Sequence, residues 1–484
     1  MLKSQPPRAT RDFLPGETAA RNQVRGQIGR VAESYGFQEI ETPSFENVEL
    51  FLARSGPEIK SSMLTFHCDH EEFALRPEMT APVCRVMASG ALEDRPAPHK
   101  LYYIGSCFRY CRPQSGRFRE FTQAGIELLG QSGAAADAEV IAVASQVIRR
   151  LGVRDSQLKI GSIAIFAGLL PDDLDADDKA AIIGHLDKLS SIDEKCRLMA
   201  KTGGETVLEE LKIDRMELAG LQADCDYSGP YAIAERPDVP ASEWADLLPR
   251  EAEATFRGVW SAQQLVSDEV SDVLRQVSRL RGPLDEVHAR AQSLLQGTPA
   301  VQALDDLLAV CRHVKAYDVG PFEVVLGIAR GFTFYTSTVF EITSGADNGG
   351  RKYCGGGRYD QLVEEFGGAP MPAAGCGFRF DALVEDFLAN NVWSPPRPYE
   401  IYLVADAEDE RVEAIRLAEA LRRQGLRVGV GTGAGDKPSE GDCERQGTQW
   451  IVFLPAEGGK ALISNGSVTK SVGRDAAAIA AAVR

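Results

Sequence analysis

The chain has 484 residues, of which 44% are hydrophobic and 25% are charged, and its formal net charge at pH 7 is −17. At roughly 100–200 residues per domain, this length predicts about two to four domains, each large enough to bury a core. The composition excludes wholesale disorder, and the acidic balance disfavours a protein that coats nucleic acid. The sequence has no long apolar run and no hydrophobic leader, and its ten cysteines are scattered. We therefore expect a cytoplasmic protein with reduced thiols.

The first part of the chain predicts helices and antiparallel strands. Residues 24–35 carry apolar side chains three and four positions apart, which is typical of an amphipathic helix. Short apolar runs at residues 101–104 and 125–129 are bounded by turn and charge signals, and they favour antiparallel strands. A second helix is predicted over residues 136–151.

The middle of the chain differs in character. From about residue 171 to 316 charge is dense and helical periodicity dominates, which indicates a helical insertion. Strand character returns at residues 324–328 and 334–342, and a glycine-rich hairpin signal follows at residues 345–350.

The proline-rich run at residues 393–398 is the best predicted linker, because its prolines favour extended backbone. After it, strands at residues 401–404, 426–430 and 450–454 alternate with a helix at residues 411–424. This alternation predicts a small α/β domain with parallel strands.

Four segments combine side chains suited to ligand binding. They are Leu75–Thr80, Phe108–Glu127, Arg330–Tyr335 and Gly355–Asp360. A strand over residues 123–127 would place Gln123, Gly125 and Glu127 on one face, where an amide and a carboxylate are costly to bury unless they bind something.

Positive charge gathers in the second of these segments. Arginines at positions 109, 112, 117 and 119 lie around a predicted turn. Guanidinium groups grip carboxylates and phosphates through paired hydrogen bonds, so the turn favours an anionic ligand.

Together these segments resemble the class II histidyl-tRNA synthetase family. Residues 109–120 resemble its motif 2 and the loop that follows, residues 330–335 its Arg-Gly-Leu-Asp-Tyr-Tyr signature, and residues 356–360 its Gly-Gly-Arg-Tyr-Asp hairpin. The resemblance implies an α+β fold: a class II aminoacyl-tRNA-synthetase-like antiparallel sheet core with a helical insertion, plus a small C-terminal α/β domain.

The resemblance also implies how the chain divides. Residues 1–165 and 320–392 would form the histidine-binding core, residues 166–319 the helical insertion, and residues 398–484 an anticodon-binding-like α/β domain. A homodimer is expected on the same ground.

The resemblance further implies a histidine pocket. Glu78 and Glu127 would hold the ammonium and imidazole ends of histidine, and a site rich in acceptors suits a ligand with several N–H donors. The histidine-binding residues implied in this way are Glu78, Thr80, Arg109, Gln123, Glu127, Arg330 and Tyr335.

The sequence departs from the family where ATP would bind. Cys111 stands where the family has a glutamate that reads the adenine amino group, and Ala382 stands where motif 3 has an arginine against ATP. Arg379 comes three residues earlier, which on a helix would turn it about 60° away. The histidine signature also changes, with Thr333 for Asp and Phe334 for Tyr.

These departures weaken the case for ATP chemistry. Losing one preorganised charge partner typically slows a reaction by about 10²–10³. Arg109, Arg117 and Arg379 remain as candidates for residual nucleotide contacts.

The sequence therefore favours a histidine sensor without ligase activity, similar to the regulatory subunit of ATP phosphoribosyltransferase in histidine biosynthesis. Its partners would be histidine and the catalytic ATP phosphoribosyltransferase subunit, and it would need no catalytic residue and no cofactor. The alternative is a divergent histidine–tRNA ligase, which would use ATP with magnesium and bind tRNA; the additional C-terminal domain supports it. A third class is an amino-acid-activating enzyme that ignores tRNA, and it also needs ATP.

One short run offers side chains that bind metals. His67, Cys68, Asp69 and His70 are adjacent, and adjacent ligands in one turn rarely converge on a single ion without distant partners. We therefore expect no metal site.

Overall fold

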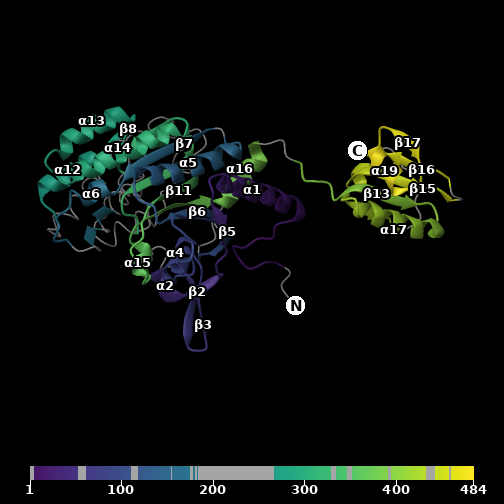
Figure 1. Cartoon of the computed structure of the whole chain (residues 1–484), viewed down its shortest axis with the longest axis horizontal. Coiled ribbons are helices and arrows are strands. Elements are labelled where there is room, and N and C mark those ends of the chain that lie inside the picture. The colour runs from purple at the N-terminus through teal and green to yellow at the C-terminus, as the bar shows by residue number, and fades with distance from the viewer. Residues whose placement is uncertain are drawn as a thin grey trace, which may run out of the picture. The chain divides into compact units, whose positions relative to one another are not determined.

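The structure is a computed structural model that describes residues 5–52, 62–110, 118–153, 155–174, 178–179, 182–183, 266–328, 334–345, 351–390, 394–431, 442–456 and 459–483. The chain forms two compact units (Figure 1). Unit 1 comprises Met1–Leu14 and Ala20–Val392, and unit 2 comprises Pro15–Ala19 and Trp393–Arg484. No helix of the described residues is both long and apolar enough to cross a membrane.

Unit 1 is built on a nine-stranded sheet in the order β1-β5-β6-β12-β11-β10-β7-β9-β8. From β5 to β7 all neighbouring strands are antiparallel, and only the pairs β1–β5 and β7–β9 are parallel. This arrangement confirms the predicted α+β fold with an antiparallel core. The strands are β1 (Gln38–Glu39), β5 (His99–Phe108), β6 (Glu120–Leu129), β7 (Ser156–Ser162), β8 (Arg281–Gly282), β9 (Phe322–Val325), β10 (Thr338–Ser344), β11 (Lys352–Arg358) and β12 (Ala373–Arg379).

Helices α1 (Pro15–Ser34), α5 (Ala134–Arg150) and α16 (Phe380–Asn390) contact one side of this sheet, which we call the back face. Arg21 of α1 donates to the hydroxyl of Thr122 on β6 at 2.6 Å, and Arg358 of β11 donates to Asp137 of α5 at 2.7 Å. Because side chains alternate along a strand, the neighbours of Thr122 and Arg358 point to the opposite side, the front face.

The first helix begins and ends as its sequence suggests. Pro15 occupies the first turn, where a missing N–H costs nothing, and Gly36 just beyond the end has a φ of +84°. That left-handed conformation is favoured by glycine, so the chain can turn sharply into β1.

Further helices of unit 1 lie between the strands in sequence. They are α4 (Thr80–Ala88), α6 (Ala164–Ala167), α12 (Asp268–Ser278), α13 (Leu284–Leu295), α14 (Ala300–Ala316) and α15 (Leu362–Glu365). Helix α14 packs against α5, α6 and α13. Residues 184–265 of the predicted insertion lie outside the described residues, so the limits of that insertion stay a prediction.

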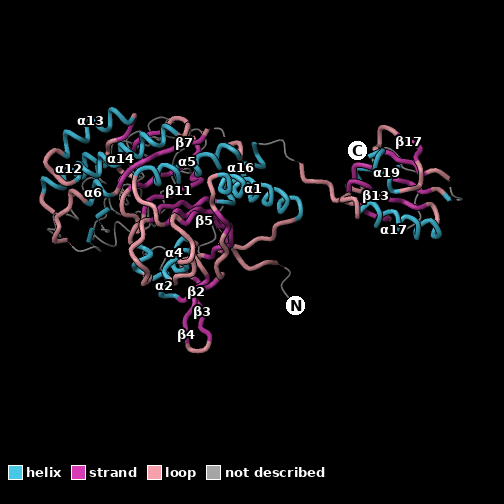
Figure 2. The backbone as a smooth tube through the Cα atoms, in the orientation of Figure 1, coloured by secondary structure: helices cyan, strands magenta, loops and turns pink. Residues whose placement is uncertain are grey.

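A separate three-stranded sheet, in the order β2-β4-β3, extends from unit 1 as Figure 2 shows. It consists of β2 (Phe45–Asn47), β3 (Leu64–Cys68) and β4 (Glu71–Leu75), and the short helix α2 (Val48–Leu52) follows β2. The rings of Phe45, Phe66 and Phe73 cluster on it with centroids 5.7 Å apart. Aromatic contacts of this kind stabilise a sheet that is too small to bury a core.

Unit 2 contains a five-stranded sheet in the order β14-β13-β15-β16-β17. Strand β13 pairs in parallel with β14 and β15, as the strand–helix alternation predicts, and β16 and β17 add an antiparallel hairpin that was not predicted. Its elements are β13 (Tyr399–Ala405), α17 (Glu408–Arg422), β14 (Val428–Val430), α18 (Asp442–Arg445), β15 (Thr448–Leu454), β16 (Ala461–Ser464), β17 (Thr469–Val472) and α19 (Ala476–Val483). Ile401, Leu403, Leu417 and Ile479 belong to one buried core, so unit 2 has a hydrophobic core of its own.

Candidate functional site

The front face of β6 carries a deeply buried carboxylate. The side chain of Glu127 is only 1% exposed. Its Oε1 accepts hydrogen bonds from the hydroxyls of Thr80 and Tyr103, both at 2.9 Å, and its Oε2 accepts from the hydroxyl of Tyr359. Burial raises the pKa of Glu127 to about 7, and the three hydroxyl donors oppose that rise. The carboxylate is held in place, and a cation or an N–H donor nearby would favour its charged form.

Tyr103 connects Gln123 and Glu127, the two residues that the strand periodicity predicted on one face. Its oxygen donates to Glu127 and accepts from the side-chain amide of Gln123 at 3.4 Å. The tyrosine lies over Gly125, since a Cβ at that position would overlap the Tyr103 hydroxyl oxygen and stand 2.7 Å from the carbonyl oxygen of Cys376. The glycine between Gln123 and Glu127 is therefore required by the approach of Tyr103.

Glycines continue this surface across neighbouring strands. In the register of β6, β12 and β11, Gly125 pairs with Gly377 and then Gly355, while Glu127 pairs with Gly375 and then Gly357. Opposite residues of antiparallel strands share a face, so these glycines form a floor without side chains beside Glu127. We call this surface the glycine floor; the side chains of Tyr103, Tyr335 and Glu127 lie over Gly125, Gly357 and Gly375, so the missing Cβ atoms make room for residues of the site itself.

Glu78 stands at the beginning of α4. Its carboxylate accepts hydrogen bonds from the backbone amides of Thr80 at 2.6 Å and Ala81 at 2.9 Å. Burial raises the pKa of Glu78, and those amides together with the charge of Arg109 oppose the rise. Glu78 therefore anchors the helix that presents the Thr80 hydroxyl to Glu127, and it adds a second buried carboxylate to the site.

Arg109 follows the last residue of β5. Its Nε donates to the carbonyl of Pro77 at 2.8 Å, and its guanidinium carbon lies 5.4 Å from the centroid of the Phe121 ring. Phe121 is two residues before Gln123, so it also belongs to the front face. The structure thus brings Arg109 to the same side of the sheet as Glu78 and Gln123.

Aromatic rings form one wall of the site. The centroid of Phe334 lies 4.8 Å from that of Tyr335 and 5.7 Å from that of Tyr359. A Cβ at Gly357 would stand 2.9 Å from the Tyr335 ring, so Tyr335 rests on the glycine floor. Tyr335 therefore packs against the same face of the sheet as Glu127, and its part in histidine binding stays a prediction.

Some predicted residues lie outside the described part of the chain. These are Arg330 and Arg117 among the expected ligand contacts, Arg112, Cys111 and Thr333 among the residues discussed with them, and most of the 345–350 hairpin signal.

The expectation for Arg379 rested on a helix, and that placement is wrong. Arg379 is the last residue of strand β12, and its register partner on β6 is Gln123. It therefore belongs to the front face, together with Gly377 and Glu127, and its side chain is exposed.

The residues that follow Arg379 begin helix α16, which contacts the back face of the sheet. Asp381, in the first turn of α16, accepts from Arg21 at 2.5 Å and from the backbone amide of Thr122 at 3.0 Å. Ala382 follows it in the same helix. The strand-to-helix junction thus separates Arg379 on the front face from Asp381 on the back face.

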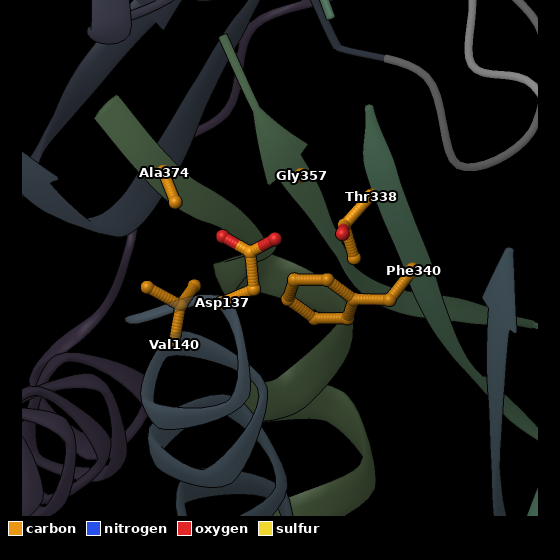
Figure 3. Close-up of a pocket in the computed structure, with 6 residues that line it drawn as sticks. All are labelled: Asp137, Val140, Thr338, Phe340, Gly357 and Ala374. Carbon is orange, nitrogen blue, oxygen red and sulfur yellow. The ribbon is translucent and has the colours of Figure 1, made fainter. Parts of the chain in front are cut away.

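A small pocket lies on the back face, between the sheet and α5 (Figure 3). Asp137 and Val140 of α5 line it, together with Thr338, Phe340, Gly357 and Ala374 from the sheet. These atoms pack too closely to admit a water molecule, so this pocket offers no ligand site.

The described residues contain no group of three or more His, Cys, Asp or Glu side chains that could hold a metal ion. Asp69 and His70, from the run considered as metal ligands, instead form the turn between β3 and β4 with φ angles of 49° and 74°. Left-handed residues in a two-residue turn are typical of a tight β-hairpin.

Comparison with known proteins identifies the family. Residues 9–212 and 238–383 match the family model described as histidyl-tRNA synthetase. The chain belongs to the histidyl-tRNA synthetase family. A protein named histidine–tRNA ligase from Methanocaldococcus jannaschii is 34% identical over 385 residues, which cover 78% of this chain and 75% of that relative. One of the same name from Pyrococcus furiosus is 31% identical over 427 residues, 87% of this chain and 84% of the relative.

Solved structures of histidyl-tRNA synthetases resemble the fold of this chain. A histidyl-tRNA synthetase from Nostoc sp. PCC 7120 has a TM-score of 0.67 at 21% identity, covering 100% of this chain and 99% of the other. A structure titled as an ATP phosphoribosyltransferase regulatory subunit/histidyl-tRNA synthetase from Bacillus halodurans has a TM-score of 0.66 at 24% identity, covering 94% of this chain and 99% of the other. At these identities the likeness shows the fold, which confirms the class II synthetase architecture expected from the sequence.

Two residues of this histidyl-tRNA synthetase family site were missed by sequence reasoning. Tyr103 and Tyr359 both donate to Glu127, yet one was counted only as part of an apolar strand and the other only as part of a glycine-rich motif. For Tyr103 the signal was Gly125, its register partner on β6, because a position without a side chain marks where a large neighbour lies across it.

Proposed function

We propose that this chain binds histidine at Glu127 and joins it to tRNA in an ATP-dependent reaction, as a histidine–tRNA ligase. The observation that carries this proposal is the buried Glu127 carboxylate, held by three hydroxyls beside the glycine floor. Such an acceptor suits an N–H donor or a cation, and histidine supplies both. The names of relatives that match over most of their length support the choice of reaction.

The charge of the site suits the ammonium group of an amino acid. Glu78 and Glu127 are both buried, and burial raises the pKa of each. A bound ammonium or imidazolium group would compensate the buried negative charge, while Arg109 is placed to meet a carboxylate or a phosphate on the same side of the sheet.

ATP would enter with its own magnesium under this proposal. Mg²⁺ in phosphoryl-transfer sites is held largely by substrate phosphates and water, with one or two protein carboxylates.

Histidine-dependent exchange of pyrophosphate into ATP tests the proposal. We expect the wild-type protein to catalyse it, and Glu127→Gln to lower the rate by about 10²-fold or more, because a preorganised acceptor is lost. Glu364→Gln is the control, since Glu364 is exposed in α15. Failure of the wild-type protein to bind histidine by calorimetric titration would overturn the pocket assignment itself.

A regulatory role is the second candidate, and the α16 junction favours it. Ala382 stands where the family's ATP-contacting arginine is expected, and Asp381 is bound to Arg21 and Thr122 on the back face. The protein would then bind histidine and regulate a catalytic ATP phosphoribosyltransferase subunit. Histidine binding without pyrophosphate exchange, together with histidine-dependent inhibition of the purified catalytic subunit by this chain, is the result expected for that role.

We also propose that the protein is a homodimer, and that residues 398–484 contact tRNA while residues 166–319 form the insertion. Light scattering of the purified chain tests the first point. For the second, tRNA affinity should fall when the chain is shortened after residue 392, with histidine affinity unchanged.

A further inference from the structure

Tyr359 donates its hydroxyl to Glu127 from a short stretch of chain that is held from behind the sheet. It is the first residue after β11, and its side chain is 1% exposed. Its backbone amide donates to the carbonyl of Ala373 at 2.8 Å. Because side chains alternate along an extended chain, its neighbours Arg358 and Asp360 point to the opposite side, the back face. The position of the hydroxyl therefore depends on bonds that are made on the other side of the sheet.

Arg358 is a buried cation with two carboxylate partners. Its Nε and one terminal nitrogen lie 2.7 and 2.5 Å from the same oxygen of Asp137, and the other terminal nitrogen donates to Asp360 at 2.9 Å. The Asp137 carboxylate points from α5 toward the sheet (Figure 3). Burial raises the pKa of Asp137, and the charge of Asp360 adds to that rise. One carboxylate already neutralises the guanidinium, so charge balance does not explain the presence of Asp360.

The other hydrogen bond of Asp360 points to its role. The Oδ1 atom that accepts from Arg358 also accepts from the backbone amide of Ala373 at 2.9 Å. Together with the bond from the Tyr359 amide to the carbonyl of Ala373, this makes two hydrogen bonds between the two chain segments. Ala373 is the first residue of β12, the strand that pairs with β6. The backbone that carries Tyr359 is thus fixed against the strand beside Glu127.

We propose that Asp360 is a positioning residue, which is held by Arg358 and keeps the Tyr359 hydroxyl on the Glu127 carboxylate. This inference rests on the proposed binding of histidine at Glu127 and deepens it, because it extends the site to the Arg358–Asp137 pair behind the sheet. An acceptor that is already oriented binds an N–H donor more tightly than one that must be ordered when the ligand arrives.

Calorimetric titration of the full-length protein with histidine tests the inference. We expect Asp360→Ala to weaken histidine binding by about tenfold, and Asp360→Asn to restore most of the affinity, because asparagine keeps an oxygen that accepts from the Ala373 amide. The Asp360 side chain is 40% exposed and Asp137 remains to pair with Arg358, so the fold should be retained. Arg358→Lys keeps the charge without the planar fork, and as a second variant it should also weaken binding.

A double-mutant cycle separates positioning from a general structural effect. Tyr359→Phe removes the hydroxyl through which Asp360 acts, so Asp360→Ala should cost no further affinity in the Tyr359→Phe background. A loss of the same size in both backgrounds would show that Asp360 supports the fold only, and the inference would be wrong.

Asp386→Ala is the matched control. Asp386 accepts from Arg351 at 3.0 Å and from the hydroxyl of Tyr353, so it also joins an arginine to a segment of β11, at the opposite end of that strand. The substitution removes the same carboxylate at a distance from Glu127, and histidine affinity should be unchanged.

The outcomes separate the two proposals. If the wild type binds histidine and Asp360→Ala binds it equally well, the inference about Asp360 is overturned while the proposed function stands. If the wild type does not bind histidine, the proposed pocket fails and the inference fails with it.

Discussion

At the scale of single residues, the site depends on how one carboxylate is buried. The carboxylate of Glu127 is held by the hydroxyls of Thr80, Tyr103 and Tyr359. Hydroxyl donors orient a carboxylate without neutralising it, so the charge stays available for a ligand. The cost is a pKa raised by burial to about 7.

That raised pKa predicts how stability depends on pH. The native state holds more protons than the unfolded chain between the ordinary pKa of 4.5 and the native value of about 7. The free energy of unfolding should therefore fall as pH rises through this window. Relative to Glu127→Gln, we expect the wild type to lose roughly 3 kcal/mol between about pH 4 and pH 8, measured by urea unfolding. Parallel curves for the two proteins would contradict the assigned pKa.

A second residue-scale prediction concerns Tyr103. Tyr103→Phe removes the hydroxyl that connects Gln123 with Glu127, so we expect histidine affinity to fall by about tenfold with the fold retained. Tyr102→Phe is the control, because the Tyr102 hydroxyl donates to Glu33 at 3.1 Å on the back face. Titration calorimetry measures both, and an equal loss in the two variants would argue against a positioning role for Tyr103.

At the scale of elements, the central strands β11 and β12 are distinguished by front-face positions that carry no side chain. Strand β12, which pairs with β6, and strand β11, which pairs with β12, carry glycines at front-face positions where a β-branched residue would otherwise be favoured. Glycine weakens a strand, and here the loss is offset by pairing on both sides and by the apolar residues of the back face.

Gly375→Ala tests this directly. A Cβ at Gly375 would overlap the Glu127 carboxylate and stand 2.6 Å from the backbone oxygen of Ile126, which cannot move aside. We expect a loss of about 3 kcal/mol in the free energy of unfolding. Gly26→Ala in α1 meets only the flexible end of Arg30 at 3.3 Å and should stabilise the helix by up to about 1 kcal/mol. Denaturant unfolding of both variants gives the comparison.

At the scale of the whole molecule, the chain contains two units with separate cores. Leu403 is fully buried within unit 2, and Leu128 is fully buried within unit 1. The core of unit 2 is formed by residues 401–480, and in the described residues its five-stranded sheet is separate from the nine-stranded sheet that contains Leu128.

We therefore expect two unfolding transitions in differential scanning calorimetry of the full chain. Leu403→Ala should destabilise one of them by about 2–5 kcal/mol, and Leu128→Ala the other, because each substitution opens a cavity in one core. A single transition that shifts equally in both variants would show that the units unfold together.

Much of the architecture could be predicted from the sequence because the signals are local. The periodicity of residues 24–35, the glycine after that helix, the strand–helix alternation after residue 398 and the shared face of Gln123 and Glu127 all follow from neighbours along the chain. The fold and the family were predicted from the order of the family motifs along the chain. Each of these was confirmed.

The tertiary structure alone decided which side chains complete the site. Tyr103 reaches Glu127 from β5, and Tyr359 reaches it from the position just after β11. Arg379 belongs to the front face because β12 continues to that residue before α16 begins. The sequence could not show this, because the period changes from two to 3.6 at a junction whose position is set by pairing with β6. Contacts between strands distant in sequence depend on register, and register is settled only when the sheet packs against its helices.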